Sequence, residues 1–129
     1  MDNIANFLTQ ILNAQMAQKT ALSSPYSKFK HAIADVLLQN GYLAAIEKKG
    51  REPSRRTLDI DLRYEQGQAA ISGVKKVSKL GQRIYRQHKK IWPVKSGYGL
   101  AVISTSQGLM TDKQAKKKGL GGEIICEVW

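Results

Sequence analysis

Hydrophobic side chains recur every three or four residues in two N-terminal stretches, which predicts two amphipathic helices. The first stretch has Asp2 or Asn3 available as a helix N-cap. Its apolar positions are Ile4, Phe7, Leu8, Ile11 and Leu12. Because its polar face carries mostly Asn, Gln and Thr, we expect this helix to dock on a core and not on a membrane surface.

The second stretch follows a break at Ser23, Ser24 and Pro25, and it ends at Asn40 and Gly41, which are a helix C-cap signal. Its apolar positions are Phe29, Ala32, Ile33, Val36 and Leu37. The break separates the two helices and leaves room for a short strand between them.

Strand patterns follow the helices. Residues 42–47 are a short strand candidate, and residues 48–56 read as a polar, basic loop. From residue 58 to residue 64 apolar and polar side chains alternate, which is the signature of a strand with one solvated face. Residues 66–68 turn the chain, so residues 70–78 are expected to be the partner strand of a hairpin. This predicts an α+β unit in the order α, α, β, β, β.

The second half is richer in glycine and has shorter patterns. Strand-like pieces are residues 83–86, 100–105 and 123–129. Thr111 or Asp112 can cap a short helix, whose lysines at 116–118 precede Gly119. We therefore expect an α+β protein of two small domains: residues 1–66 with two helices packed on a short sheet, and residues 67–129, mostly β with one short helix.

The charge of the chain is concentrated in its second half. The whole sequence has 21 Lys+Arg against 10 Asp+Glu, a formal net charge of +11. Residues 1–65 carry nine cations and seven carboxylates, net +2, whereas residues 66–129 carry twelve and three, net +9. A field concentrated in this way is what a phosphate-binding surface requires, so the partner class is a polyanion.

Other sequence features argue against a membrane protein, a disulfide-bonded protein and a metal- or cofactor-binding protein. No run approaches the roughly 18 apolar residues that span a bilayer, and no targeting segment is evident, so we expect no membrane partner. The single cysteine, Cys126, has no intramolecular disulfide partner, which favours a reducing cytosol, and we read it as a small core residue. We expect no metal and no cofactor.

Catalysis is a poor interpretation of this sequence. A hydrolase would need His31 or His88 to converge with Asp59 and Asp61 in one cleft. Asp59 and Asp61 alternate with apolar residues, as the solvated side of an amphipathic strand does. We therefore expect no enzyme.

The strongest candidate for chemistry is a run of hydroxyl and amide side chains at residues 104–108. Such groups can donate to phosphates, 2′-hydroxyls and base edges, and Gly108 permits close approach of the backbone to a ligand. Lysines follow at 113 and 116–118. Residues 75–95 add eight cations, interleaved with Tyr85 and Trp92, and we expect Trp92, which precedes Pro93, to be a core anchor.

Two long motifs carry a family resemblance. Residues 101–112 (AVISTSQGLMTD) and 119–126 (GLGGEIIC) closely resemble the C-terminal signature of the bacterial small-subunit ribosomal protein eight family. Residues 4–9 (IANFLT), 27–30 (SKFK) and 83–85 (RIY) extend the resemblance over nearly the whole chain.

The resemblance implies a two-domain α+β structural constituent of the small (30S) ribosomal subunit in the cytoplasm. Such a protein binds the central domain of small-subunit rRNA directly, promotes its assembly and lies beside other ribosomal proteins. The alternative is a translational repressor that binds an rRNA-like site in its own operon mRNA. The candidate RNA-binding residues are Ser104, Thr105, Ser106, Gln107, Gly108, Gly122, Glu123, Lys28, Lys30, Arg83, Tyr85, Arg86, Lys113, Lys116 and Lys117.

Overall fold

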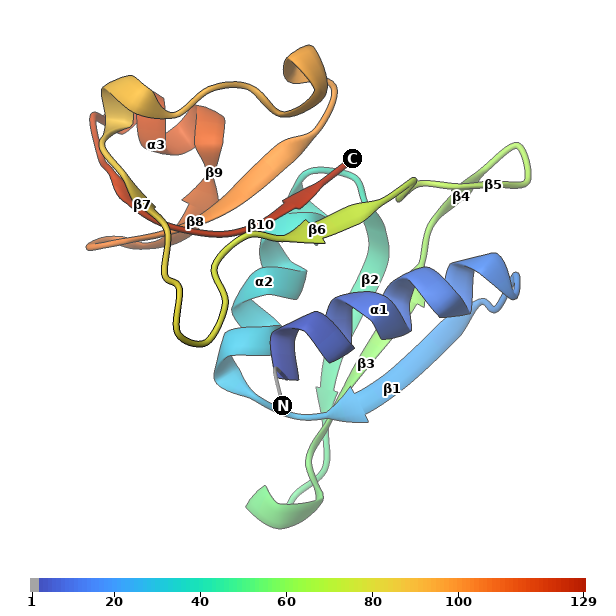
Figure 1. Cartoon of the computed structure of the whole chain (residues 1–129). Helices are drawn as coiled ribbons and strands as arrows, with labels where there is room; N and C mark the ends of the chain where they lie inside the picture. Colours follow the sequence, from blue (N-terminus) through green and yellow to red (C-terminus); the bar gives the residue numbers. More distant parts are fainter. Residues whose placement is uncertain (1–2) are drawn as a thin grey trace. The chain divides into compact units, whose positions relative to one another are not determined.

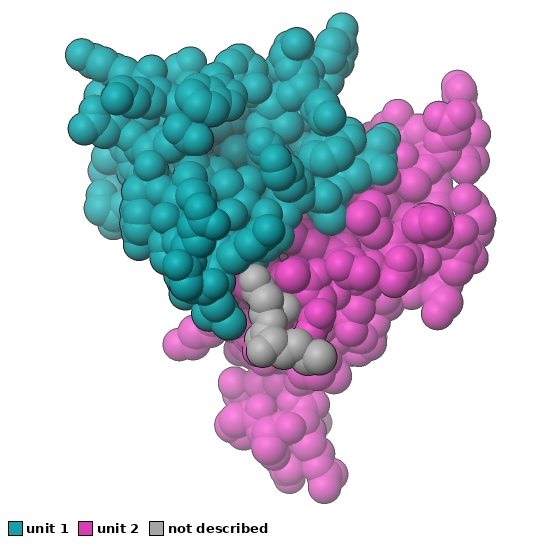
Figure 2. Space-filling view, in the orientation of Figure 1, with its two compact units in different colours: residues 1–2, 72–129 teal, residues 3–71 magenta. Residues whose placement is uncertain are grey.

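A computed structural model describes residues 3–129 and divides the chain into two compact units. The N-terminal unit is Asn3–Ile71 and the C-terminal unit contains residues 72–129 (Figure 2). Each unit combines helix with antiparallel sheet, so the predicted α+β class is confirmed.

Both predicted helices are present in the N-terminal unit (Figure 1). Helix α1 spans Asn3–Met16 and buries Phe7, Leu8 and Ile11. Asn3 is the first residue of the helix, and Asp2, the other predicted N-cap, lies outside the described residues. Helix α2 spans Lys28–Gln39, with Ser27 as N-cap and Asn40 as C-cap.

A short strand occupies the segment that the sequence suggested as a break. Strand β1 (Ala21–Pro25) pairs with β3 (Thr57–Leu62), and β3 pairs on its other edge with β2 (Leu43–Lys49). The short strand that the sequence left room for between the two helices is therefore present, and the order of elements begins α, β, α. The alternation in β3 is confirmed: its apolar residues are fully or nearly buried, whereas Asp59 and Asp61 belong to the other face.

The predicted hairpin partner at residues 70–78 is wrong. The hairpin after β3 is much shorter and joins β4 (Tyr64–Glu65) to β5 (Gln68–Ala69). Strand β6 (Val74–Lys76) pairs instead with the C-terminal strand, β10 (Gly122–Val128). Local alternation predicts an extended chain but not its partner, and here the carbonyl of Trp129 accepts from the backbone N–H of Ser72 and Gly73.

The C-terminal unit is built on a four-stranded path in the order β6-β10-β8-β9. Strands β8 (Leu100–Thr105) and β9 (Gly108–Thr111) form a tight hairpin, and β7 (Tyr85–Arg86) pairs with the first residues of β10. The sequence did not predict β9. One face of this sheet holds a core cluster to which Ile91, Ala101, Ile103, Met110, Ala115 and Ile124 contribute.

Helix α3 (Asp112–Lys118) confirms the predicted short helix. Thr111 caps it: its hydroxyl accepts from the backbone N–H of Gln114, whose side chain in turn accepts from the N–H of Thr111. Buried Asp112 accepts a hydrogen bond from the backbone N–H of Ala101 at 3.1 Å, which ties α3 to β8. Gly119 ends the helix in the left-handed conformation.

Cys126 is fully buried in β10, as expected for a core residue. Desolvation raises the pKa of its thiol to about 12. Since the reactive species is the thiolate, this cysteine stays inert at neutral pH.

Candidate nucleic-acid interface

Four side chains form a row across the strands at one end of the C-terminal sheet. Glu123 of β10 lies opposite Tyr85 of β7 on one edge and opposite Ser104 of β8 on the other, and Ser104 lies opposite Leu109 of β9. Directly opposed residues of antiparallel strands share a face. Tyr85, Glu123, Ser104 and Leu109 therefore lie side by side, and we call them the hairpin row.

The hairpin row faces away from the core of the C-terminal unit. The neighbouring row consists of Ile124, Ile103 and Met110, which are all buried in the core cluster. Successive residues of a strand point to opposite faces, so the hairpin row is turned to the other side. Tyr85 is 68% exposed, and the other three side chains are half-buried.

The turn between β8 and β9 is held by one of the three predicted hydroxyls. The Thr105 hydroxyl accepts from the backbone N–H of Gln107 at 3.1 Å and donates to the carbonyl of Gly108 at 2.8 Å. The side chains of Ser106 and Gln107 are exposed at the tip. Thr105 thus shapes the hairpin, whereas the polar side chains of Ser104, Ser106 and Gln107 are partly or fully exposed at its surface.

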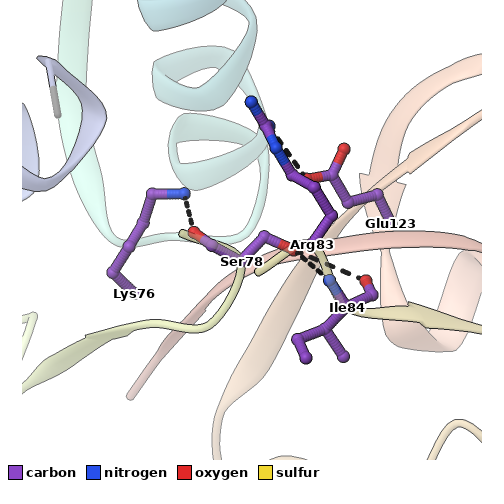
Figure 3. Close-up of polar contacts among 5 residues, drawn as sticks. All are labelled: Lys76, Ser78, Arg83, Ile84 and Glu123. Carbon is purple, nitrogen blue, oxygen red and sulfur yellow. Dashed lines mark hydrogen bonds and ion pairs between the residues drawn. The ribbon is translucent and has the colours of Figure 1, made fainter. Parts of the chain in front are cut away.

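Glu123 is held in place by Arg83. The Arg83 guanidinium donates to the Glu123 carboxylate at 3.2 Å, with the Glu123 side chain 14% exposed and that of Arg83 53% exposed (Figure 3). The pair leaves part of the guanidinium facing solvent, where it can meet a phosphate. Glu123 itself would repel a phosphate, so its carboxylate suits a neutral or cationic hydrogen-bond donor.

Ser78, which the sequence did not single out, supports this pair. Its side chain is completely buried, and its hydroxyl accepts from the backbone N–H of Ile84 at 2.9 Å (Figure 3). Ile84 follows Arg83 and packs against the core cluster. The Lys76 ammonium donates to the Ser78 carbonyl, so the loop from β6 to β7 is fixed at both ends. A lone serine in a basic stretch carries no sequence signal for such a role.

Replacing Ser78 by Ala should lower the free energy of unfolding by about 2 kcal/mol, because the partly buried N–H of Ile84 loses its acceptor. Urea denaturation followed by circular dichroism measures the change. Ser72→Ala is the matched control, since Ser72 is exposed, and it should change stability by less than about 0.5 kcal/mol. Equal stability of the two variants would show that Ser78 does not brace this loop.

Two glycines let the strands approach closely beside the hairpin row. A Cβ at Gly122 would lie 2.2 Å from the Ser104 carbonyl oxygen, and a Cβ at Gly121 would lie 2.5 Å from the Arg86 carbonyl oxygen. Both distances are far below contact, so side chains are excluded. An open hollow of about 390 Å³ lies over these glycines, bordered by Tyr85 and His88.

Several cations lie on α3 and β7, two elements of the C-terminal unit that adjoin the strands of the hairpin row. Lys113, Lys116 and Lys117 are exposed on α3, which directly follows β9, and their i, i+3, i+4 spacing places them on one helix face. Arg86 of β7 lies over the Trp92 ring, with its guanidinium carbon 4.2 Å from the ring centroid. The prediction that Trp92 is a core anchor is wrong: it is 61% exposed.

Lys28 and Lys30 belong to the N-terminal unit, whereas the hairpin row belongs to the C-terminal unit. Lys28 is exposed at the start of α2. The Lys30 ammonium donates to the Ser24 hydroxyl at 3.2 Å and lies 5.8 Å from the centroid of the Phe7 ring. Lys30 therefore has an intramolecular role in holding α2 to β1 and α1.

The groups of the hydrolase hypothesis have other partners. Asp59 accepts from the hydroxyls of Ser23 and Thr57 and pairs with Lys49, and the two hydroxyl bonds hold the pKa of its carboxyl below the usual value. His31 shares a hydrogen bond with the Tyr26 hydroxyl. Within residues 3–129 no group of three His, Cys, Asp or Glu side chains could hold a metal ion.

Comparison with known proteins covers nearly the whole chain. The family described as Ribosomal protein S8 matches residues 2–129. The small ribosomal subunit protein uS8 of Acinetobacter baylyi is 47% identical over 127 residues, covering 98% of this chain and 96% of that protein. The uS8 protein of a Nocardioides species is 44% identical over 133 residues, covering 99% and 97%.

The chain belongs to the ribosomal protein S8 family. Members of this family are structural proteins of the small ribosomal subunit and not enzymes, so the predictions of family and of a non-enzymatic protein are confirmed. Among residues 3–129 no helix is both long and apolar enough to cross a membrane.

Proposed function

We propose that this protein binds the central domain of small-subunit rRNA directly and promotes assembly of the subunit in the cytoplasm. The observation that carries the proposal is the hairpin row: Tyr85, Glu123 and Ser104 present partly solvated polar groups on a sheet, next to an exposed tip of Ser106 and Gln107. Rigid sheet elements hold donors more accurately than a flexible loop does.

The arrangement suits an irregular RNA helix. The deep, narrow major groove of regular duplex RNA hides its base edges, whereas bulges and internal loops expose bases and 2′-hydroxyls. The tip hydroxyl and amide meet these groups, Tyr85 offers an exposed ring for stacking, and the lysines of α3 contact flanking phosphates. Contacts between the lysines and the RNA phosphates supply most of the binding affinity, and the polar hairpin tip selects RNA of the right shape.

Ser106→Ala should weaken binding to a central-domain rRNA fragment about fivefold, since one hydrogen bond contributes about 1 kcal/mol. The salt dependence should stay unchanged, because no charge is lost. Fluorescence anisotropy at several salt concentrations measures both quantities, with Ser72→Ala as the control. An unchanged dissociation constant for Ser106→Ala would remove the hairpin tip from the binding site.

The same face would accept a messenger that reproduces the rRNA structure, because shape and not a linear sequence is recognised. Repression of its own operon mRNA is therefore the second function that we propose to test. Sedimentation distinguishes the two: a ribosomal constituent moves with small subunits, whereas a dedicated repressor moves with the leader of its mRNA.

A further inference from the structure

A second hollow lies in the C-terminal unit, on the sheet face opposite to the hairpin row. Its volume is about 180 Å³. The floor is apolar and consists of Ile91, Val94, Ala101 and Ile124. Ile91 and Val94 come from the segment between β7 and β8, which is drawn yellow to orange in Figure 1.

Strand geometry explains why the hollow and the hairpin row are separate. Arg86 follows Tyr85 in β7, so the two side chains point to opposite faces of the sheet. On the β10 side, Glu127 lies opposite both Lys75 and Ala101, and all three line the hollow. The hollow is therefore a distinct site on the core side of the sheet.

The rim combines an aromatic ring, two cations and one carboxylate. Trp92 is exposed and is held by the Arg86 guanidinium at 4.2 Å. Lys75 is exposed, and Glu127 is half-buried. The guanidinium already covers one face of the indole ring and restricts its motion. The ring therefore loses little conformational entropy when a second ring stacks on it.

The segment around the hollow, residues 75–95, is strongly basic, as nucleic-acid-binding segments are. The sequence has no carboxylate between Glu65 and Asp112, whereas residues 75–95 hold eight cations. A basic segment with an exposed aromatic ring is how proteins bind unpaired nucleic acid, since bases stack on the ring and the phosphates track the cations.

We propose that this hollow binds one unpaired base of RNA, so that the protein has a second RNA contact besides the hairpin row. The inference rests on the proposed rRNA-binding function. The base stacks beside Trp92 over the apolar floor, and its flanking phosphates meet Arg86 and Lys75. Glu127 accepts a hydrogen bond from an exocyclic amine, which cytosine and adenine have and uracil lacks.

The size of the hollow limits the occupant. Sites for drug-sized ligands measure about 300–1,000 Å³, so 180 Å³ admits a single base and excludes a duplex. The carboxylate of Glu127 repels phosphates, so the phosphates stay beside Arg86 and Lys75 while the base enters the hollow. A protein side chain is the competing occupant, and the experiment below separates it from RNA.

The test uses labelled single-stranded hexamers of cytidylate, adenylate and uridylate, with affinities measured by fluorescence anisotropy. We expect cytidylate and adenylate to bind more tightly than uridylate. Trp92→Ala should weaken cytidylate binding about tenfold, as loss of one base–aromatic stack does, and Trp92→Phe should restore most of it. Glu127→Leu should abolish the preference for cytidylate over uridylate.

Tyr98→Ala is the matched control, because Tyr98 is 88% exposed in the same segment but does not line the hollow. Equal effects of Trp92→Ala and Tyr98→Ala, or equal binding of cytidylate and uridylate, would overturn the proposal. A third outcome would assign the hollow to a protein partner instead. In that case the Trp92→Ala variant would bind the hexamers as tightly as the unchanged protein does, but it would fail to enter reconstituted small subunits. The proposed binding to rRNA is tested by a different measurement, the affinity of the Ser106→Ala variant for the rRNA fragment, so the two proposals can fail independently.

Discussion

Gly122→Ala should lower the free energy of unfolding by about 3 kcal/mol, at the upper end of the usual cost of overpacking. The added methyl group would lie 2.2 Å from the carbonyl oxygen and 2.9 Å from the carbonyl carbon of Ser104. Neither atom can move without separating β8 from β10. Urea denaturation measures the loss, and binding to the rRNA fragment should weaken as well, because the Glu123–Ser104 pair is displaced.

Gly67→Ala is the control for this substitution. Gly67 lies in the β4–β5 turn with φ +80° and no atom near its missing Cβ, so alanine there costs only backbone strain of about 1 kcal/mol. If Gly122→Ala were as stable as Gly67→Ala, the close packing of β8 and β10 at the hairpin row would be wrong.

Replacing Lys113, Lys116 and Lys117 together by Gln should weaken rRNA binding roughly 100-fold at 0.15 M salt and reduce the slope of log affinity against log salt by about 2.7. The three side chains share one face of α3, and each phosphate contact releases about 0.9 counterions. Glutamine keeps the helix propensity, and Gln114 keeps its place in the capping box. Titrations at four salt concentrations give the slope.

A matched triple variant distinguishes direct phosphate contacts made by the lysines of α3 from the effect of lowering the net charge of the protein. Lys48, Arg51 and Arg55 are exposed in the N-terminal unit, and their replacement by Gln removes the same charge. We expect a smaller loss of affinity and a smaller change of slope. Equal slopes for the two triple variants would mean that the lysines of α3 act only through the net charge of the protein.

The sequence predicted the helices well because their signals are local. The i, i+3, i+4 stripes, the Asn40 and Thr111 caps and Gly119 each act within one or two turns. It failed where pairing is distant: residues 74–76 contact β10, about fifty residues away, and β1 pairs with β3 across 36 positions. Periodicity predicts an extended strand but carries no information about the strand beside it.

The sequence singled out most residues of the candidate site but did not predict how they are arranged in space. The run of hydroxyls at 104–106 pointed to Ser104 and Ser106, yet only the structure assigns the Thr105 hydroxyl to the turn and brings Tyr85 beside Glu123. The exposed Trp92 was misread because tryptophan is usually core, and the stacking of Arg86 on its ring depends on how the segment after β7 turns back.

The most direct test of rRNA recognition is directed cleavage of small-subunit rRNA from a chelated iron on Lys118→Cys. Cys126 is fully buried with its thiol pKa raised to about 12, so the introduced cysteine takes the label. Gln66→Cys in the N-terminal unit is the control. Direct binding through the C-terminal unit predicts strong cleavage around one irregular helical region of the central domain from position 118 and a weaker, different pattern from position 66. Absence of cleavage in that domain, or the same pattern from both positions, would contradict it.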